Sequence, residues 1–260
     1  MRVVVLPTAD DVSRRSAEII VGCVQKKTMA VLGLATGGTP LGTYREMIKA
    51  QQAGKVSFRD VTTFNLDEYV GLGPEHPQSY RHFMLEHLFS KADFDADKCH
   101  VPDGLAGDYV EYCTSYEQKI RDSGGIDLQL LGIGTDGHIA FNEPGSSLAS
   151  RMRLKALTER TRIDNSRFFA VGEEVPYLAV TMGVGTILEA RRILMLATGG
   201  NKANAVRAFV EGPVTAQIPA SALQIHPQVT VLLDEAAAEW LLRREYYNEV
   251  ERIQLRVEHR

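Results

Sequence analysis

The chain has 260 residues, 44% of them hydrophobic and 24% charged, which is the composition of an ordinary globular protein with one large domain. Its 29 basic and 33 acidic residues give a net charge of -4, so nucleic acid, which usually needs a broad basic face, is not an expected partner. Three scattered cysteines argue against a disulfide framework or a zinc site, and no signal-peptide core or membrane-spanning apolar run is present. We therefore expect a single cytoplasmic domain over residues 1–260.

Short runs rich in Val, Ile and Leu alternate with longer amphipathic segments, which is typical of parallel strands joined by crossover helices. Strands are predicted at 2–7, 30–35, 61–66, 128–134, 178–181, 192–197 and 229–233, and helices at 10–26, 41–52, 203–211 and 235–247. This order predicts an α/β fold with a doubly wound, mostly parallel, Rossmann-like sheet flanked by helices. Residues 144–176 are the least regular segment, and we expect them to form a lid or a small extra layer.

Ligands of open α/β sheets bind beyond the carboxyl ends of the strands, so the polar residues that follow each strand are candidates for a site. The strand at 30–35 is followed by Thr36, Gly37, Gly38, Thr39 and Pro40. The glycines let the backbone curl, the hydroxyls donate, and the proline suits a helix start whose free N–H groups face an anion. This pattern predicts a phosphate cradle, although a plain strand-to-helix turn has the same composition.

A second glycine turn follows the strand at 192–197 and ends at Lys202, which opens the next predicted helix. A lysine at this position can meet a phosphate, whereas a lone surface lysine is more often simply solvated. The presence of two Gly-Gly turns at strand ends favours phosphate binding over a plain surface lysine.

Paired carboxylates, Asp67 and Glu68, follow the strand at 61–66. Acids at such a position can serve as acid/base groups at the sheet edge. Taken alone, they are more often solvated or cap a helix.

The segment after the most apolar strand, 128–134, places Asp136, His138 and Glu143 among glycines and apolar residues. Asp136 and His138 are two residues apart, so in an extended segment both side chains project from one face, and Glu143 can return to them after a turn. A histidine between carboxylates can transfer protons near neutral pH, which predicts acid/base catalysis. Metal binding is the alternative chemistry for these residues, but no HExxH or comparable ligand spacing is present. The sequence also lacks the GxSxG motif of a serine nucleophile and a complete GxGxxG dinucleotide-binding turn.

The chain resembles the glucosamine-6-phosphate deaminase family in four motifs: FNLDEYVGL at 64–72, HPQSYRHFM at 76–84, GIGTDGHIAFNEPGSSLASR at 132–151 and ATGGNKA at 197–203. The resemblance spans nearly the whole chain and implies conversion of glucosamine 6-phosphate and water into fructose 6-phosphate and ammonia. It implies that His138, supported by Asp136 and Glu143, opens the sugar ring, and that Asp67 moves a proton from C2 to C1. No metal or organic cofactor is implied.

The resemblance also assigns residues to the substrate phosphate and to an effector. The phosphate residues are Gly37, Gly38, Thr39, Arg167 and Lys202, with Thr36 beside them. Some bacterial members are hexamers activated by N-acetylglucosamine 6-phosphate, and four residues match their effector positions: Ser146, Arg153, Lys155 and Tyr246. Ala156 departs from the threonine common in those members, which puts the activation in doubt.

Two other functions remain as alternatives. A 6-phosphogluconolactonase has a similar fold and a similar GxGxDGH segment, but lactonases usually continue toward ASLFP where this chain has IAFNEP, and lactone hydrolysis has no need of Asp67. A non-catalytic sugar-phosphate sensor typically carries a DNA-binding domain or lacks the acid/base residues, whereas this chain begins its first strand at Arg2 and retains all of them.

Overall fold

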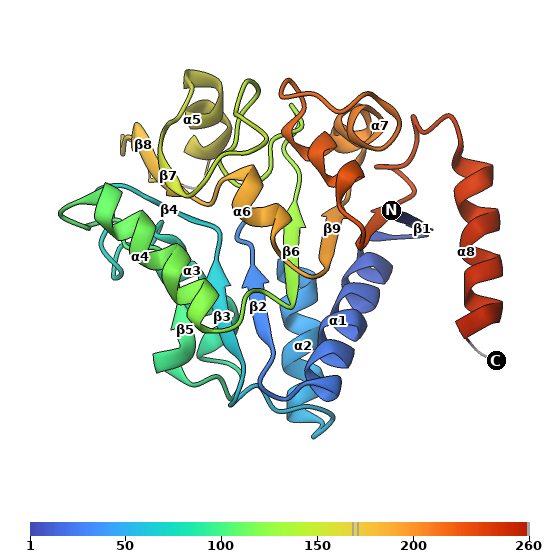
Figure 1. The fold of residues 1–260 in the computed structure, drawn as a ribbon, viewed down its shortest axis with the longest axis horizontal. Coiled ribbons are helices and arrows are strands. Elements are labelled where there is room, and N and C mark those ends of the chain that lie inside the picture. Colours follow the sequence, from blue (N-terminus) through green and yellow to red (C-terminus); the bar gives the residue numbers. More distant parts are fainter. Residues whose placement is uncertain (168, 171, 259–260) are drawn as a thin grey trace.

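The computed structural model describes residues 1–167, 169–170 and 172–258, and its centre is a seven-stranded sheet (Figure 1). The order is β1-β10-β9-β6-β2-β3-β5, and each neighbouring pair is parallel. The strands are β1 (Arg2–Leu6), β2 (Val31–Leu34), β3 (Thr62–Asn65), β5 (Cys99–His100), β6 (Leu128–Gly132), β9 (Ile193–Ala197) and β10 (Val229–Asp234). The predicted α/β class is confirmed.

Helices cover both faces of this sheet, which explains why its strands are apolar throughout. On one face, α1 and α2 pack with the segment around Met84 over Leu32, Leu130 and Leu194. On the other face, α4, α6 and α7 pack over alternate strand residues such as Leu131 and Met195. The helices are α1 (Ala9–Lys26), α2 (Leu41–Gln52), α3 (Tyr80–Met84) continued by a π-helix (Leu85–Phe89), α4 (Tyr109–Asp122), α5 (Glu159–Ser166), α6 (Val184–Leu188), α7 (Ala203–Glu211) and α8 (Arg244–Glu258), with 3₁₀ turns at Ala96–Lys98, Gly200–Lys202 and Pro219–Ile225.

A second, antiparallel sheet lies beside the carboxyl ends of the central strands, in the order β4-β8-β7. It consists of β4 (Asp67–Tyr69), β8 (Leu178–Thr181) and β7 (Arg153–Ala156). The predicted strand at 178–181 therefore exists but belongs to this sheet and not to the parallel one. The expected small layer at 144–176 contains β7 and α5.

The predicted helix at 235–247 is wrong, because residues 235–240 form turns and α8 begins only at Arg244. The Asp234 carboxylate accepts hydrogen bonds from the backbone of Ala237 and of Gly199, which ties this turn to a distant loop. Tertiary hydrogen bonds and burial of Ala237 thus override the helix propensity of the alanine run. Within the described part of the chain, no helix is both long and apolar enough to cross a membrane.

Candidate active site

Four of the predicted polar loops meet at one edge of the central sheet. Their strands, β9, β6, β2 and β3, are consecutive neighbours, and the pairing of Leu34 with Asn65 and of Gly132 with Leu196 brings their carboxyl ends level. In a parallel sheet all such ends share one edge. The structure therefore brings the two glycine turns, the Asp67 segment and the His138 segment to the same side of the molecule.

Asp67 is deeply buried at this edge, with 6% of its surface exposed. It begins β4 and pairs with Thr181 of β8, so it lies in a strand of the second sheet and not in a free loop. Burial, reinforced by the neighbouring charge of Glu68, raises the pKa of Asp67 to about 8. A carboxyl group with this pKa can both take up and return a proton near neutral pH.

The Glu68 carboxylate caps the start of a helix, which is one of the two roles that its position in the sequence allowed. Its carboxylate is 2% exposed and accepts hydrogen bonds from the backbone N–H of Tyr69, Tyr80 and Arg81 at 2.8, 2.9 and 3.0 Å. It thereby ties the start of α3 to β4. Burial raises the pKa of Glu68 to about 7 even though the three N–H groups favour its charged form.

Asp136 and His138 form a hydrogen-bonded pair, but the segment that carries them is a turn, with Gly137 at a φ of 85°, and not the extended segment that was predicted. His138 Nδ1 lies 2.6 Å from Asp136 Oδ1, and the backbone N–H of His138 donates to the same oxygen at 3.2 Å. Partial burial raises the pKa of Asp136, but the bond and charge of His138 outweigh burial and bring this pKa to about 2. A side chain at Gly134 would put its Cβ 2.1 Å from the imidazole Cε1, so only glycine leaves room for the ring.

The segment that carries His138 is attached to the strand opposite Asp67. The backbone N–H of Phe141 donates to Thr181 Oγ1 at 3.2 Å, and Asn142 Nδ2 donates to the carbonyl of Met182 at 2.8 Å. Thr181 is also the β8 partner of Asp67. Asp67 and the segment that carries His138 are therefore linked through β8, although they are far apart in the sequence.

Glu143 is buried, but its carboxylate is held by α5 and not by the histidine pair. Its Oε1 accepts hydrogen bonds from Thr158 N at 3.2 Å, from Thr158 Oγ1 at 2.9 Å and from Thr161 Oγ1. Sequence reasoning missed both threonines. The signal that could have found Thr158 is its N-cap pattern, since its hydroxyl also accepts from the backbone of Thr161.

Each glycine turn contains a glycine in the left-handed region of the backbone. Gly37 and Gly199 have φ values of 93° and 89°, in the left-handed region that favours glycine. The space beside Gly37 and Gly38 is open, since a Cβ there would meet no atom within 4 Å, and α2 starts after Pro40 without a side-chain cap. Asp234 fixes the other turn by accepting from Gly199 N at 2.9 and 3.0 Å.

The remaining predicted phosphate residues either flank the first glycine turn or occupy the ends of helices. Thr36 and Thr39 are half-buried on either side of the glycines. Lys202 is the N-cap residue of α7, and Arg167 is the exposed C-cap residue of α5.

The four predicted effector residues do not come together within one chain. Arg153 and Lys155 lie on β7, and Ser146 is buried next to the Glu143 turn. Tyr246 lies on α8 at the opposite flank of the molecule (Figure 1) and is 60% exposed. A single site that uses all four residues therefore needs Tyr246 from another copy.

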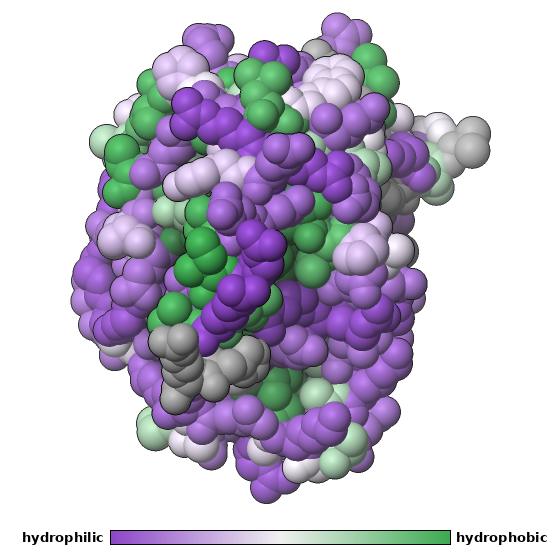
Figure 2. Space-filling view, turned by 90° about the vertical axis from the view of Figure 1, so that its right-hand side faces the viewer, coloured by the Kyte–Doolittle hydropathy of each residue, from purple (hydrophilic) through white to green (hydrophobic). Residues whose placement is uncertain are grey.

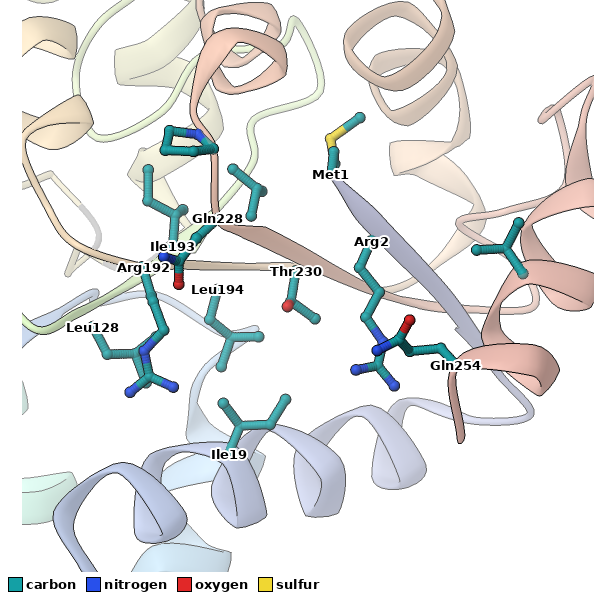
Figure 3. Close-up of a pocket in the computed structure, with 13 residues that line it drawn as sticks. Met1, Arg2, Ile19, Leu128, Arg192, Ile193, Leu194, Gln228, Thr230 and Gln254 are labelled. Atoms are coloured by element: carbon teal, nitrogen blue, oxygen red, sulfur yellow. The ribbon is translucent and has the colours of Figure 1, made fainter. Parts of the chain in front are cut away.

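A cavity of about 540 Å³ lies at the other edge of the sheet, beside the amino ends of β1, β9 and β10 (Figure 3). Arg2, Arg192 and Gln254 line it, and none of the predicted site residues does. It is therefore separate from the acid/base groups. Among the residues that the structure describes, no group of three or more His, Cys, Asp or Glu side chains is placed to hold a metal ion.

Comparison with known proteins identifies the family. The model of the family described as glucosamine-6-phosphate isomerases/6-phosphogluconolactonase matches residues 7–232. Proteins named glucosamine-6-phosphate deaminase from Hahella chejuensis and Mycolicibacterium smegmatis are 52% and 51% identical, over 99% and 97% of this chain and 98% and 97% of their own.

Comparison with solved structures leads to the same family. A structure described as a monomeric glucosamine-6-phosphate deaminase superposes with a TM-score of 0.89 at 45% identity, covering 92% of this chain and 99% of its own. A 6-phosphogluconolactonase from Trypanosoma brucei reaches a TM-score of 0.73 at 21% identity, covering 92% of this chain and 97% of its own, which shows the fold alone. This chain belongs to the glucosamine-6-phosphate isomerase/6-phosphogluconolactonase family.

Proposed function

We propose that this protein is a cytoplasmic enzyme of amino-sugar catabolism that converts glucosamine 6-phosphate and water into fructose 6-phosphate and ammonia. The observation that carries the proposal is the pair of separate acid/base centres at one sheet edge, the buried Asp67 and the hydrogen-bonded Asp136 and His138. An aldose-to-ketose conversion needs these two functions, a base over adjacent carbons and a group for the ring oxygen. The deaminases that are about half identical over nearly the full chain support the same reaction.

The two glycine turns are proposed to hold the substrate phosphate. Backbone N–H groups of Gly37 and Gly38 and the hydroxyls of Thr36 and Thr39 donate to its oxygens, at the start of a helix whose dipole favours an anion. The cations of Lys202 and Arg167 complete the site.

His138 is proposed to open the pyranose ring. The bond from Nδ1 to Asp136 assigns the Nδ1–H tautomer, which leaves Nε2 free to take the proton of the O1 hydroxyl and deliver it to the ring oxygen. The ionised Asp136 stabilises the intermediate imidazolium. Glu143, fixed by its two threonine partners, adds a second negative charge to this loop.

Asp67 is proposed to take the proton from C2 and return it to C1. This changes the open-chain amino aldose into an enolamine and then into an imine at C2, to which water adds as ammonia leaves. The positive amino group of the substrate is bonded to the carbon that loses the proton, so it favours the ionised carboxylate despite the burial of Asp67.

The test measures ammonia and fructose 6-phosphate released from glucosamine 6-phosphate without added metal, for the wild type, Asp67→Asn and the exposed control Asp10→Asn. We expect equimolar products from the wild type and the control, and a loss of at least about 100-fold in Asp67→Asn. Failure of the folded wild type to release either product overturns the proposal, and hydrolysis of 6-phosphogluconolactone is then the reaction to measure.

We also propose that the chain forms a homo-oligomer, with a hexamer favoured, and that N-acetylglucosamine 6-phosphate activates it. The effector would contact Ser146, Arg153 and Lys155 of one copy and Tyr246 of another, since Tyr246 lies on the far flank. Rate-versus-substrate curves with and without the effector test this activation. Unchanged curves remove it, which is the outcome expected if Ala156 has abolished the site.

A further inference from the structure

Two adjacent residues at the end of β8, Thr181 and Met182, hold the strand that carries Asp67. Thr181 is the antiparallel partner of Asp67, and the backbone N–H of Met182 donates to the carbonyl of Leu66 at 2.8 Å. On its other side, Thr181 is paired with Arg153 of β7. The pairing with the Asp67 segment uses backbone atoms, so it does not depend on the Thr181 side chain.

The same two residues hold the segment that carries His138, but here a side chain is needed. Thr181 Oγ1 accepts a hydrogen bond from the backbone N–H of Phe141 at 3.2 Å, and the carbonyl of Met182 accepts one from Asn142 Nδ2 at 2.8 Å. The Thr181 hydroxyl donates its own hydrogen to the Met182 carbonyl at 3.3 Å, which leaves the oxygen lone pairs for Phe141. The position of the His138 segment therefore depends on this hydroxyl.

The turn after His138 contains a residue in an unfavourable backbone conformation. Ala140 has a φ of 51°, in the left-handed region where the Cβ of an alanine is crowded. Such a conformation persists only where surrounding contacts hold it. An antiparallel bridge closes this turn, and the bond from Phe141 to Thr181 ties it to β8. Without the hydroxyl the turn can relax, which displaces His138, two residues before Ala140.

Thr181 does not contact a substrate, because none of its surface is exposed. Any effect of Thr181 on catalysis is therefore exerted through the segments that it holds. In the proposed reaction, Asp67 acts at C2 and C1 and His138 at the ring oxygen of the same sugar. The covalent geometry of the sugar fixes the separation of these atoms. The two side chains must keep a matching separation, and a misplacement of about 1 Å can cost about 100-fold in rate.

We propose that Thr181 is a positioning residue, whose hydroxyl fixes the His138 imidazole relative to Asp67. This inference rests on the proposed reaction and adds to it a residue that does not touch the sugar. A hydroxyl group is required because it accepts the N–H of Phe141, whereas valine has the same shape and cannot accept a hydrogen bond. Valine also suits a strand, so Thr181→Val weakens the hold on the His138 segment and leaves the pairing with Asp67 in place.

Steady-state kinetics of ammonia release test the proposal with Thr181→Val, Thr181→Ser and the matched control Thr186→Val. Thr186 is also buried, and its hydroxyl donates to Glu117 in the contact between α6 and α4. We expect Thr181→Val to lower kcat at least about 10-fold with KM within about twofold, because the proposed phosphate residues are untouched, and Thr181→Ser to keep the wild-type kcat. Thr186→Val should lower the melting temperature and keep kcat. A wild-type kcat for Thr181→Val, or an equal loss of kcat in Thr186→Val, overturns the proposal.

A double-mutant cycle with His138→Ala distinguishes the positioning of His138 from a general loss of structure. A sugar ring opens slowly without a catalyst, so His138→Ala should keep a low rate that can be followed at high enzyme concentration. We expect Thr181→Val to lower this residual rate by less than about twofold, since no imidazole is left to misplace. If Thr181→Val lowers the rate by the same factor with and without His138, the hydroxyl does not act through this histidine and the proposal is refuted.

Asn142→Leu removes the second bond that holds the segment, from Asn142 Nδ2 to the Met182 carbonyl, without touching Thr181. It provides the test if Thr181→Val does not fold. We expect kcat to fall in the same way with KM unchanged. A wild-type kcat for this variant would show that the position of the segment does not limit the reaction, and would overturn the proposal.

The end of β8 is far from the flank that carries α8 (Figure 1), whose surface mixes hydrophilic and hydrophobic residues (Figure 2). The sedimentation coefficient of Thr181→Val should therefore equal that of the wild type, and a change would attribute the loss of activity to assembly and overturn the proposal. A wild type that releases no ammonia overturns the proposed reaction itself. Wild-type release that Thr181→Val does not reduce leaves the reaction in place and refutes only the role of Thr181.

Discussion

Replacing Asp67 by asparagine should stabilise the fold while it removes activity, and the gain should depend on pH. The folded state raises the pKa of Asp67 from 3.8 to about 8 because the carboxyl group is buried beside Glu68. Between these two values the unfolded chain has lost the proton and the folded chain retains it. The wild type is therefore destabilised as pH rises, by about 1.4 kcal/mol per pH unit, and asparagine has no proton to lose.

The difference in unfolding free energy between Asp67→Asn and the wild type should thus grow by about 3 kcal/mol from pH 5 to pH 7. Urea unfolding at the two pH values measures it, and any change in packing or hydrogen bonding caused by the amide cancels because it is the same at both. The exposed control Asp10→Asn should show no such growth. If the advantage of Asp67→Asn is equal at pH 5 and pH 7, the buried carboxyl group does not retain its proton and the reasoning is refuted.

Three further substitutions separate positioning from chemistry at the site. Burial is the main cause of the raised pKa of Asp67, and the charge of Glu68 adds to it. Glu68→Gln removes that charge, so the acid limb of kcat/KM should move to lower pH, and an unmoved limb means that Glu68 acts only as a cap. Gly134→Ala should lower kcat/KM about 100-fold because its Cβ takes the place of the imidazole, while Gly132→Ala, with open space around its Cβ, should resemble the wild type. Equal activities for the two would contradict that account. Thr161→Val leaves buried Glu143 without one donor and should cost about 1–3 kcal/mol in urea unfolding, and a smaller loss would show that Thr158 suffices.

The period of the apolar residues and the polar residues that follow each run predicted much of the fold. The apolar runs that became β2 and β9 are fully buried strands, and β6 is buried except at its last residue, as expected for strands covered on both faces. The prediction that several polar loops share one edge follows from the geometry of parallel sheets and is confirmed by the strand order. The close pairing of Asp136 with His138 was also accessible, because two residues on one side of a short turn depend little on the rest of the chain.

Sequence patterns failed where a distant partner decides the local structure. The strand at Leu178–Thr181 looks like any other apolar strand, and only its pairing with β4 and β7 puts it in the second sheet. The alanine-rich run after Asp234 has a high helix propensity, yet Asp234 turns it by bonding to Ala237 and Gly199.

The fold class, the candidate acid/base residues and the loops that carry them could be predicted from the sequence, because they follow from local spacing and from the period of apolar residues. Tertiary structure decided how those groups differ from one another. Glu68 is a clamp and Asp67 a buried acid although they are adjacent, because one carboxylate meets three N–H groups and the other meets apolar surroundings and its neighbour's charge. Burial and hydrogen bonding come from segments far apart in the chain, so no local pattern encodes them.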